Sequence, residues 1–213
     1  MKRTKRRTLQ SILGLAAWSL LVASSISVSH ACDLPGLIKD SQTHAVVRLT
    51  TALGHIDIQV DLQHAPITAC NFLKYIARGA YDGGSFGRTV RPANQLNAAV
   101  PISVVQAYPS PTTEPMPPIL LERTDASGLH HKDGTISMAR GSTDDATSEF
   151  FICIGDQPEL DYGGHRNSDG QGFAAFGQVI RGMDIVRRIH MQPASGEELT
   201  PPVLIKSAKV IAR

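Results

Sequence analysis

Several patterns that would assign the chain to a common class of protein are missing from its 213 residues. The strongest apolar run, Ile12 to Ala23, is too short to span a bilayer comfortably. Strand-like and helical segments do not alternate regularly, which excludes a parallel α/β sheet. A Gly-x-Ser-x-Gly nucleophile motif is absent. His130 and His131 have no second ligand cluster at a suitable spacing, so we expect neither a metal ion nor a cofactor.

Cysteine and tryptophan are also scarce. The only tryptophan is Trp18, and the three cysteines are Cys32, Cys70 and Cys153. An odd number of cysteines leaves at least one of them unpaired, modified or joined to another chain. Cys70 falls in a helical pattern and Cys153 in a strand-like run, so we interpret both as small buried apolar residues.

The first 31 residues have the pattern of a secretory signal peptide. A basic segment, Met1 to Arg7, precedes an apolar run from Leu9 to Val28, and Ser29-His30-Ala31 follows as a small-residue cleavage pattern. Cleavage after Ala31 would make Cys32 the first residue of an exported domain. Two alternatives stay open, an uncleaved membrane anchor and a lipoprotein acylated at Cys32. Ser29 disfavours acylation, because the lipid-attachment motif has Leu at that position.

The basic residues are concentrated in this leader. The whole chain has a formal net charge of +2, and the leader holds five Lys and Arg residues and no acidic residue. The rest of the chain therefore carries a net charge of −3. A basic surface for nucleic acid is not indicated. We expect no nucleic-acid partner, and no membrane contact unless Cys32 is lipidated.

Residues 45–213 read as one domain, and residues 32–44 read as a polar linker before it. Eight segments are rich in β-branched and aromatic residues, which is typical of strands. They are 46–51, 55–60, 86–90, 102–106, 135–139, 150–154, 173–180 and 203–211. The second of these alternates apolar and polar residues, which predicts a half-buried edge strand. One helix is predicted from Pro66 to a stop at Gly79, and a shorter one from Met183 to Ile189.

This order of segments favours an all-β antiparallel domain that closes into a barrel. Two of the strands, 135–139 and 150–154, hold a long polar loop between them, Gly141 to Thr147. Two others each place one polar side chain in an apolar run, Arg88 and Gln106. A polar side chain in such a run must find a partner or face a ligand.

These motifs resemble those of the cyclophilin family of peptidyl-prolyl cis-trans isomerases, and in particular its secreted bacterial members. The resemblance covers roughly Ala45 to Ile211. It is carried by Phe86-Gly87-Arg88, Val105-Gln106, Ile136-Ser137-Met138-Ala139, Ser148-Glu149-Phe150-Phe151-Ile152 and Phe173-Ala174-Ala175-Phe176-Gly177. It implies an eight-stranded barrel with a helix over each open end. It also implies a periplasmic or secreted isomerase that acts on proline-containing polypeptides.

Rotation about an X–Pro bond is slow because the C–N bond is partly double. A catalyst needs only to bind the twisted amide better than either planar form, with a fixed donor near the prolyl nitrogen. The resemblance assigns that donor to Arg88, and it gives Gln106 the role of orienting the substrate and supporting the arginine. It assigns the contacts with the client to Phe86, Met138, Ala139, Arg140, Glu149, Phe151, Leu160 and Phe173.

The sequence departs from the family pattern around the expected proline pocket. Ser103 and Val104 replace the usual Phe and Met, so we expect another apolar residue, Leu96 or Val100, to refill the space. Glu159 stands where many members have Trp on the pocket rim, which predicts poor binding of cyclosporin. The altered pocket leaves one alternative function, a non-catalytic module that binds proline-containing segments as a chaperone or scaffold.

Overall fold

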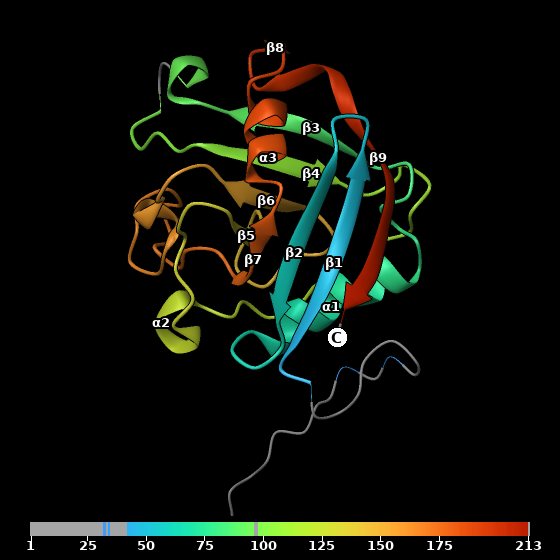
Figure 1. Ribbon diagram of the computed structural model, residues 1–213. Coiled ribbons are helices and arrows are strands. Elements are labelled where there is room, and N and C mark those ends of the chain that lie inside the picture. Colours follow the sequence, from blue (N-terminus) through green and yellow to red (C-terminus); the bar gives the residue numbers. More distant parts are fainter. Residues whose placement is uncertain (1–31, 33, 35–41, 96–97, 213) are drawn as a thin grey trace, which may run out of the picture.

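The computed structural model describes Cys32, Leu34 and residues 42–95 and 98–212, which form one barrel (Figure 1). The predicted signal peptide and most of the predicted linker lie outside the described residues. Within the described part, no helix is long and apolar enough to cross a membrane.

The barrel is a closed antiparallel sheet of eight strands, as predicted. Around the barrel the order is β1-β2-β7-β5-β6-β4-β3-β9, and the pairing of β1 with β9 closes it. A two-residue strand, β8, extends the start of β9. The bounds are β1 His44–Thr51, β2 His55–Asp61, β3 Ser85–Val90, β4 Val104–Tyr108, β5 Thr135–Met138, β6 Phe150–Cys153, β7 Ala175–Arg181, β8 Ala194–Ser195 and β9 Glu198–Ala212.

Closure changes the role of β2, for which the alternating pattern predicted an edge. The apolar residues of β2 do face the core, but β1 lies on one side of this strand and β7 on the other. Asp57 of β2 is also buried, at 4% exposure. Its two carboxylate oxygens accept hydrogen bonds from Arg48 of β1 at 2.7 and 2.8 Å. This bidentate ion pair compensates for the desolvation of the Asp57 carboxylate and keeps its pKa below the usual value.

In the described part of the chain, three α-helices accompany the barrel: α1 Pro66–Ala77, α2 Thr124–Ser127 and α3 Met183–His190. Figure 1 shows α1 near one end of the barrel and α3 near the opposite end, in agreement with the two predicted helices. The short α2 was not predicted. Phe72 of α1 packs edge-on against Phe150 of β6, with ring centroids 5.4 Å apart. The residues that α1 buries in the core include Ala69, Phe72, Leu73 and Ile76, which have the i, i+3, i+4, i+7 spacing of one helix face.

Two apolar clusters fill the domain. The larger one is the barrel core, and its fully buried side chains include Phe72, Tyr75, Tyr81, Phe86, Met138, Phe150 and Phe176. The smaller one lies beside it and consists of Val90, Ile102, Val104, Phe151, Cys153, Leu160 and Phe173. The smaller cluster brings together apolar residues from β3, β4, β6 and two loops, so it can form the wall of a pocket.

The interpretation of Cys70 as an unpaired buried residue was wrong, because Cys70 forms a disulfide with Cys32. The two cysteines are 38 residues apart, so the bond fastens the start of the described chain to α1. A sulfur in a disulfide cannot also carry a thioether-linked lipid, which opposes the lipoprotein alternative. Cys153 is free and buried in β6, as predicted, and burial raises the pKa of its thiol far above the usual value.

Candidate active site

One pocket of about 430 Å³ opens beside the smaller apolar cluster. It gathers eight of the ten predicted site residues: Arg88, Gln106, Ala139, Arg140, Glu149, Phe151, Leu160 and Phe173. The other two, Phe86 and Met138, do not line it. Their side chains are at most 1% exposed and belong to the barrel core, so their expected contact with a client is not what the structure shows.

A β-bulge explains why Phe86 and Arg88 point to different places. In a regular strand, residues two apart project from the same face. Between Phe86 and Arg88 the pairing of β3 shifts by one residue against β4 and by three residues against β9. Phe86 therefore packs inside the barrel, while Arg88 faces the pocket. Bulges commonly re-aim a side chain in this way beside a functional site.

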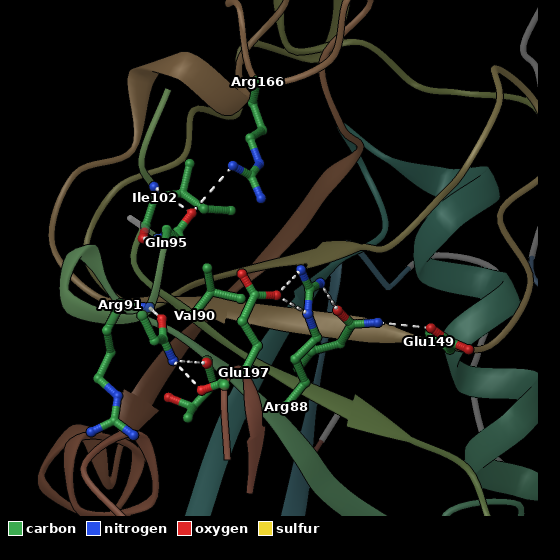
Figure 2. A network of polar contacts seen from close by, with 12 residues as sticks. Arg88, Val90, Arg91, Gln95, Ile102, Glu149, Arg166 and Glu197 are labelled. Atoms are coloured by element: carbon green, nitrogen blue, oxygen red, sulfur yellow. Dashed lines mark hydrogen bonds and ion pairs between the residues drawn. The ribbon is translucent and has the colours of Figure 1, made fainter. Parts of the chain in front are cut away.

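The guanidinium of Arg88 is held on two sides (Figure 2). Its Nη1 donates to Oε1 of Gln106 at 2.8 Å, across the β3–β4 pair. Its Nε and Nη2 donate to one oxygen of Glu197 at 2.8 and 2.6 Å. These bonds use three of the five N–H groups of the guanidinium and fix its plane, so one N–H on each terminal nitrogen is left for a client.

Gln106 continues this network to the opposite side. Its Nε2 donates to Oε2 of Glu149 at 2.7 Å (Figure 2). The four side chains alternate in the order Glu197, Arg88, Gln106 and Glu149, with a donor facing an acceptor at each contact. Glu149 thus supplies the acceptor for the side-chain amide of Gln106.

The apolar wall of the pocket consists mainly of aromatic and aliphatic side chains. Phe151 and Phe173 meet edge to face with ring centroids 5.4 Å apart, and Leu160 is fully buried next to them. Ile102 and Val104 complete this wall. Of the two residues that we expected to refill the pocket, Val100 is not among the lining residues and Leu96 lies outside the described residues. An apolar hollow of this kind suits a pyrrolidine ring.

The loop that begins after β5 also lines the pocket, through Ala139, Arg140, Gly141, Asp145 and Thr147. Asp145 accepts hydrogen bonds from the backbone N–H groups of Gly141 and Ser142 at 3.0 and 2.6 Å, which holds the loop in shape. Arg140 turns its guanidinium away, to Asp169 at 2.8 and 2.9 Å and onto the ring of Phe173. The Arg140 side chain is 1% exposed, so Arg140 can offer a client its backbone but not its charge.

Two polar residues of this region were missed by the sequence analysis. Glu197 lies in the turn between β8 and β9, 109 residues from its partner Arg88. Arg166 lies in the long loop before β7 and lines the pocket. Its Nη1 donates to the carbonyl of Val100 at 2.9 Å and to Oε1 of Gln95 at 3.2 Å. No local signal marks either residue, since Glu197 reaches Arg88, and Arg166 reaches the pocket, from a surface loop.

Glu159 does not take the place on the pocket rim that the resemblance implied. Its carboxylate accepts from the backbone N–H of His165 at 2.9 Å and lies 3.0 Å from Nδ1 of the same residue. It lines a separate cleft, next to His130 and Asp161. Glu159 is therefore not among the residues that line the pocket, whereas Arg166 of the same loop is one of them.

The two adjacent histidines, His130 and His131, differ in burial. His131 is 1% exposed, with Nδ1 2.6 Å from Oδ1 of Asp161 and Nε2 2.9 Å from Oγ of Ser137. Burial lowers the pKa of His131, and the nearby Asp161 carboxylate opposes this only in part. Ser137 is fully buried too, so this trio has no access to a substrate. In the described part of the chain no group of three His, Cys, Asp or Glu side chains could hold a metal ion.

Comparisons with known proteins agree with this geometry. Residues 46–210 match the family model for "Cyclophilin type peptidyl-prolyl cis-trans isomerase/CLD". Peptidyl-prolyl cis-trans isomerase A of Dickeya dadantii is 33% identical over 91% of this chain and 98% of its own length. A peptidyl-prolyl cis-trans isomerase of Acinetobacter baylyi is 31% identical over 85% of this chain and 92% of its own. The crystal structure of a Cryptosporidium parvum cyclophilin in the presence of the dipeptide Ala-Pro has a TM-score of 0.64 and 18% identity, covering 79% of this chain and 99% of that one.

Proposed function

The chain belongs to the family of cyclophilin-type peptidyl-prolyl cis-trans isomerases, and from this we propose that it isomerises X–Pro bonds in exported proteins that are still unfolded or partly folded. Prolyl isomerisation is the activity of the family, and the chain is an isomerase of this kind. The export of its clients and the roles of its individual residues are the proposed part.

The observation that carries the residue assignment is a fixed arginine beside an apolar hollow. Twisting the amide returns electron density to the prolyl nitrogen, so a charged donor placed there stabilises the twisted state more than the planar ones. Arg88 suits this role because a guanidinium is a rigid, planar donor and because it keeps N–H groups free beyond those bound by Gln106 and Glu197. The reaction forms and breaks no covalent bond, so no nucleophile is required.

The other residues act by holding the client. Phe151, Leu160 and Phe173 accept the proline ring and exclude water from it. Ala139 and Arg140 line the same pocket, and their backbone pairs with the client chain. Gln106 connects Arg88 to Glu149 and aligns the guanidinium with the bound amide. Binding on both sides of the X–Pro bond allows one side to rotate while the other is held.

Two features support action outside the cytoplasm. The sequence begins with the pattern of a secretory signal peptide. The disulfide between Cys32 and Cys70 is of a kind that persists in oxidising compartments and is rare in the cytosol. Mass spectrometry of the protein from its host should find a chain that starts near Cys32 with these two cysteines oxidised. A full-length, reduced product from the cytoplasm would contradict export.

A refolding assay tests the proposed activity on proteins. The client is an unfolded protein whose slow refolding phase is limited by a trans-to-cis prolyl bond. The isomerase at catalytic concentration should accelerate that phase, and the Arg88→Ala variant should lose most of the acceleration. Arg181→Ala is the matched control, because Arg181 is 77% exposed and lies outside the pocket. Binding of the client without any acceleration would favour the non-catalytic alternative.

A further inference from the structure

Arg166 differs from the other arginines of the pocket in its partners. Arg88 is paired with Glu197 and Arg140 with Asp169. Among the residues that the structure describes, no carboxylate lies within ion-pair distance of Arg166. Both of its hydrogen bonds come from Nη1 and go to uncharged oxygens, so its Nε and Nη2 are left without a protein acceptor among these residues.

The position of Arg166 is nevertheless well defined. Its Nη1 is shared between the carbonyl of Val100 and the side chain of Gln95. Gln95 is itself 8% exposed and is bonded to the backbone of Ile102 in both directions, at 2.6 and 3.3 Å. Figure 2 shows the Arg166 side chain extending from its loop toward Gln95, on the side of Arg88 away from Glu149. The guanidinium is therefore held at one end and free at the other.

The electrostatic environment favours an anion at this point. Partial burial lowers the pKa of Arg166 and the positive charge of Arg88 lowers it further, while the Glu197 carboxylate opposes this only in part. A partly desolvated cation next to another cation is stabilised when a carboxylate approaches it. The free N–H groups of Arg166 can donate charge-assisted hydrogen bonds to such a group. The same pocket holds the apolar wall for proline, so we infer that the anion is a side chain of the client itself.

We propose that Arg166 is a specificity-determining residue that binds a carboxylate of the client within a few residues of the isomerised proline. This proposal rests on the proposed function and adds a substrate class to it, X–Pro segments flanked by Asp or Glu. Arg166 touches the client but not the rotating bond. Its contribution is therefore to affinity for acidic segments, and it is measured as a ratio between charged and neutral peptides.

The test uses short peptides with one X–Pro bond. In each set of three peptides a single position holds Glu, Gln or Lys, and the sets differ in that position, which is one of the three residues before or the three residues after the proline. At one of these positions kcat/KM of the full isomerase should be about fivefold higher for the Glu peptide than for the Gln peptide. This ratio lies between the effects expected for an exposed ion pair and for a buried charge-assisted hydrogen bond. Lys at that position should be the poorest substrate. Arg166→Gln should bring the Glu-to-Gln ratio to about one, and Arg166→Lys should restore part of it.

Arg181→Gln removes the same charge outside the pocket and should keep the ratio of the unchanged protein. If Arg166→Gln does not fold, the salt dependence of the ratio in the unchanged protein serves instead, and the acid preference should fall toward one as added salt screens the pair. A ratio near one at every position, or a preference that survives Arg166→Gln, would overturn the proposal.

Failure of the proposed function gives a different result. In that case no peptide, charged or neutral, is isomerised faster than in buffer. The specificity of Arg166 can then still be read by calorimetric titration of the same peptides, where Glu should lower Kd about fivefold relative to Gln. Equal Kd values for the two peptides would refute the binding role as well.

Discussion

Removing the carboxylate of Glu197 should slow catalysis without weakening the binding of the client. Glu197 receives two of the three protein hydrogen bonds that fix the Arg88 guanidinium, at 2.6 and 2.8 Å. In Glu197→Ala, only the bond to Gln106 remains, and the guanidinium can rotate about that contact. We interpret Glu197 as a positioning residue that acts through Arg88.

The geometry sets the size of the effect. Hydrogen bonds to charged groups contribute about 1.5–3 kcal/mol each, whereas exposed ion pairs contribute about 0.2–1 kcal/mol. The side chains of Arg88 and Glu197 are 33% and 29% exposed, so an intermediate value applies. A loss of about 1–2 kcal/mol in orientation corresponds to a decrease of roughly five- to thirtyfold in rate. The decrease should appear in kcat, with KM nearly unchanged.

The assay is a steady-state isomerisation measurement on one X–Pro peptide with Glu197→Ala, Glu197→Gln and Glu159→Ala. Glu197→Gln keeps an acceptor oxygen and should recover part of the loss. Glu159→Ala is the matched control, because Glu159 lines the separate cleft, and its rate should stay within about twofold of the unchanged protein, as for most surface substitutions. A higher kcat/KM with a lower KM in Glu197→Ala would refute positioning, since it would mean that Glu197 competes with the client for Arg88.

Three further outcomes are expected. Reduction of the Cys32–Cys70 disulfide, or Cys70→Ala, should lower the free energy of unfolding by about 4 kcal/mol on the chain-entropy model for a loop of 38 residues, measured by denaturant titration. Burial lowers the pKa of His131 in the folded state, so the stability that neutral His131 contributes is complete above the usual histidine pKa and is lost as the pH falls through the lowered pKa. Unfolding curves between pH 8 and pH 4 should show this loss of stability, and the His131→Asn variant should not show it. Phe173→Ala should raise KM for a proline peptide by about tenfold, because it opens the apolar wall, and an unchanged KM would place the proline ring elsewhere.

The strands, the two longer helices and the pairing of Arg88 with Gln106 were accessible from the sequence because each rests on local pattern or on a motif. The apolar stripe of α1 follows from helical spacing, and Arg88 and Gln106 stand out as polar residues in apolar strands. The bulge that separates Phe86 from Arg88 has no such signal. The bulge turns Phe86 into the core, and the sequence motif Phe86-Gly87-Arg88 alone does not indicate that Phe86 and Arg88 face different sides.

The residues that were missed or misplaced depend on long-range contacts. Glu197 reaches Arg88 from a turn 109 residues away, and Arg166 reaches the pocket from a loop rich in glycine and polar residues. Such loops carry no periodicity from which a direction could be inferred. The disulfide between Cys32 and Cys70 likewise depends on the path of the segment that precedes the barrel, and three cysteines alone allow several pairings.

The most direct test of the account is the exchange rate between the cis and trans forms of a proline peptide, measured by magnetisation-exchange NMR with catalytic amounts of protein. Loss of one fixed charged donor commonly costs about a hundredfold or more in rate. The account therefore predicts fast exchange with the unchanged protein and at least a hundredfold less catalysis with Arg88→Ala, while Arg181→Ala behaves as the unchanged protein does. Catalysis by a folded Arg88→Ala variant at the rate of the unchanged protein would contradict the central role of this arginine.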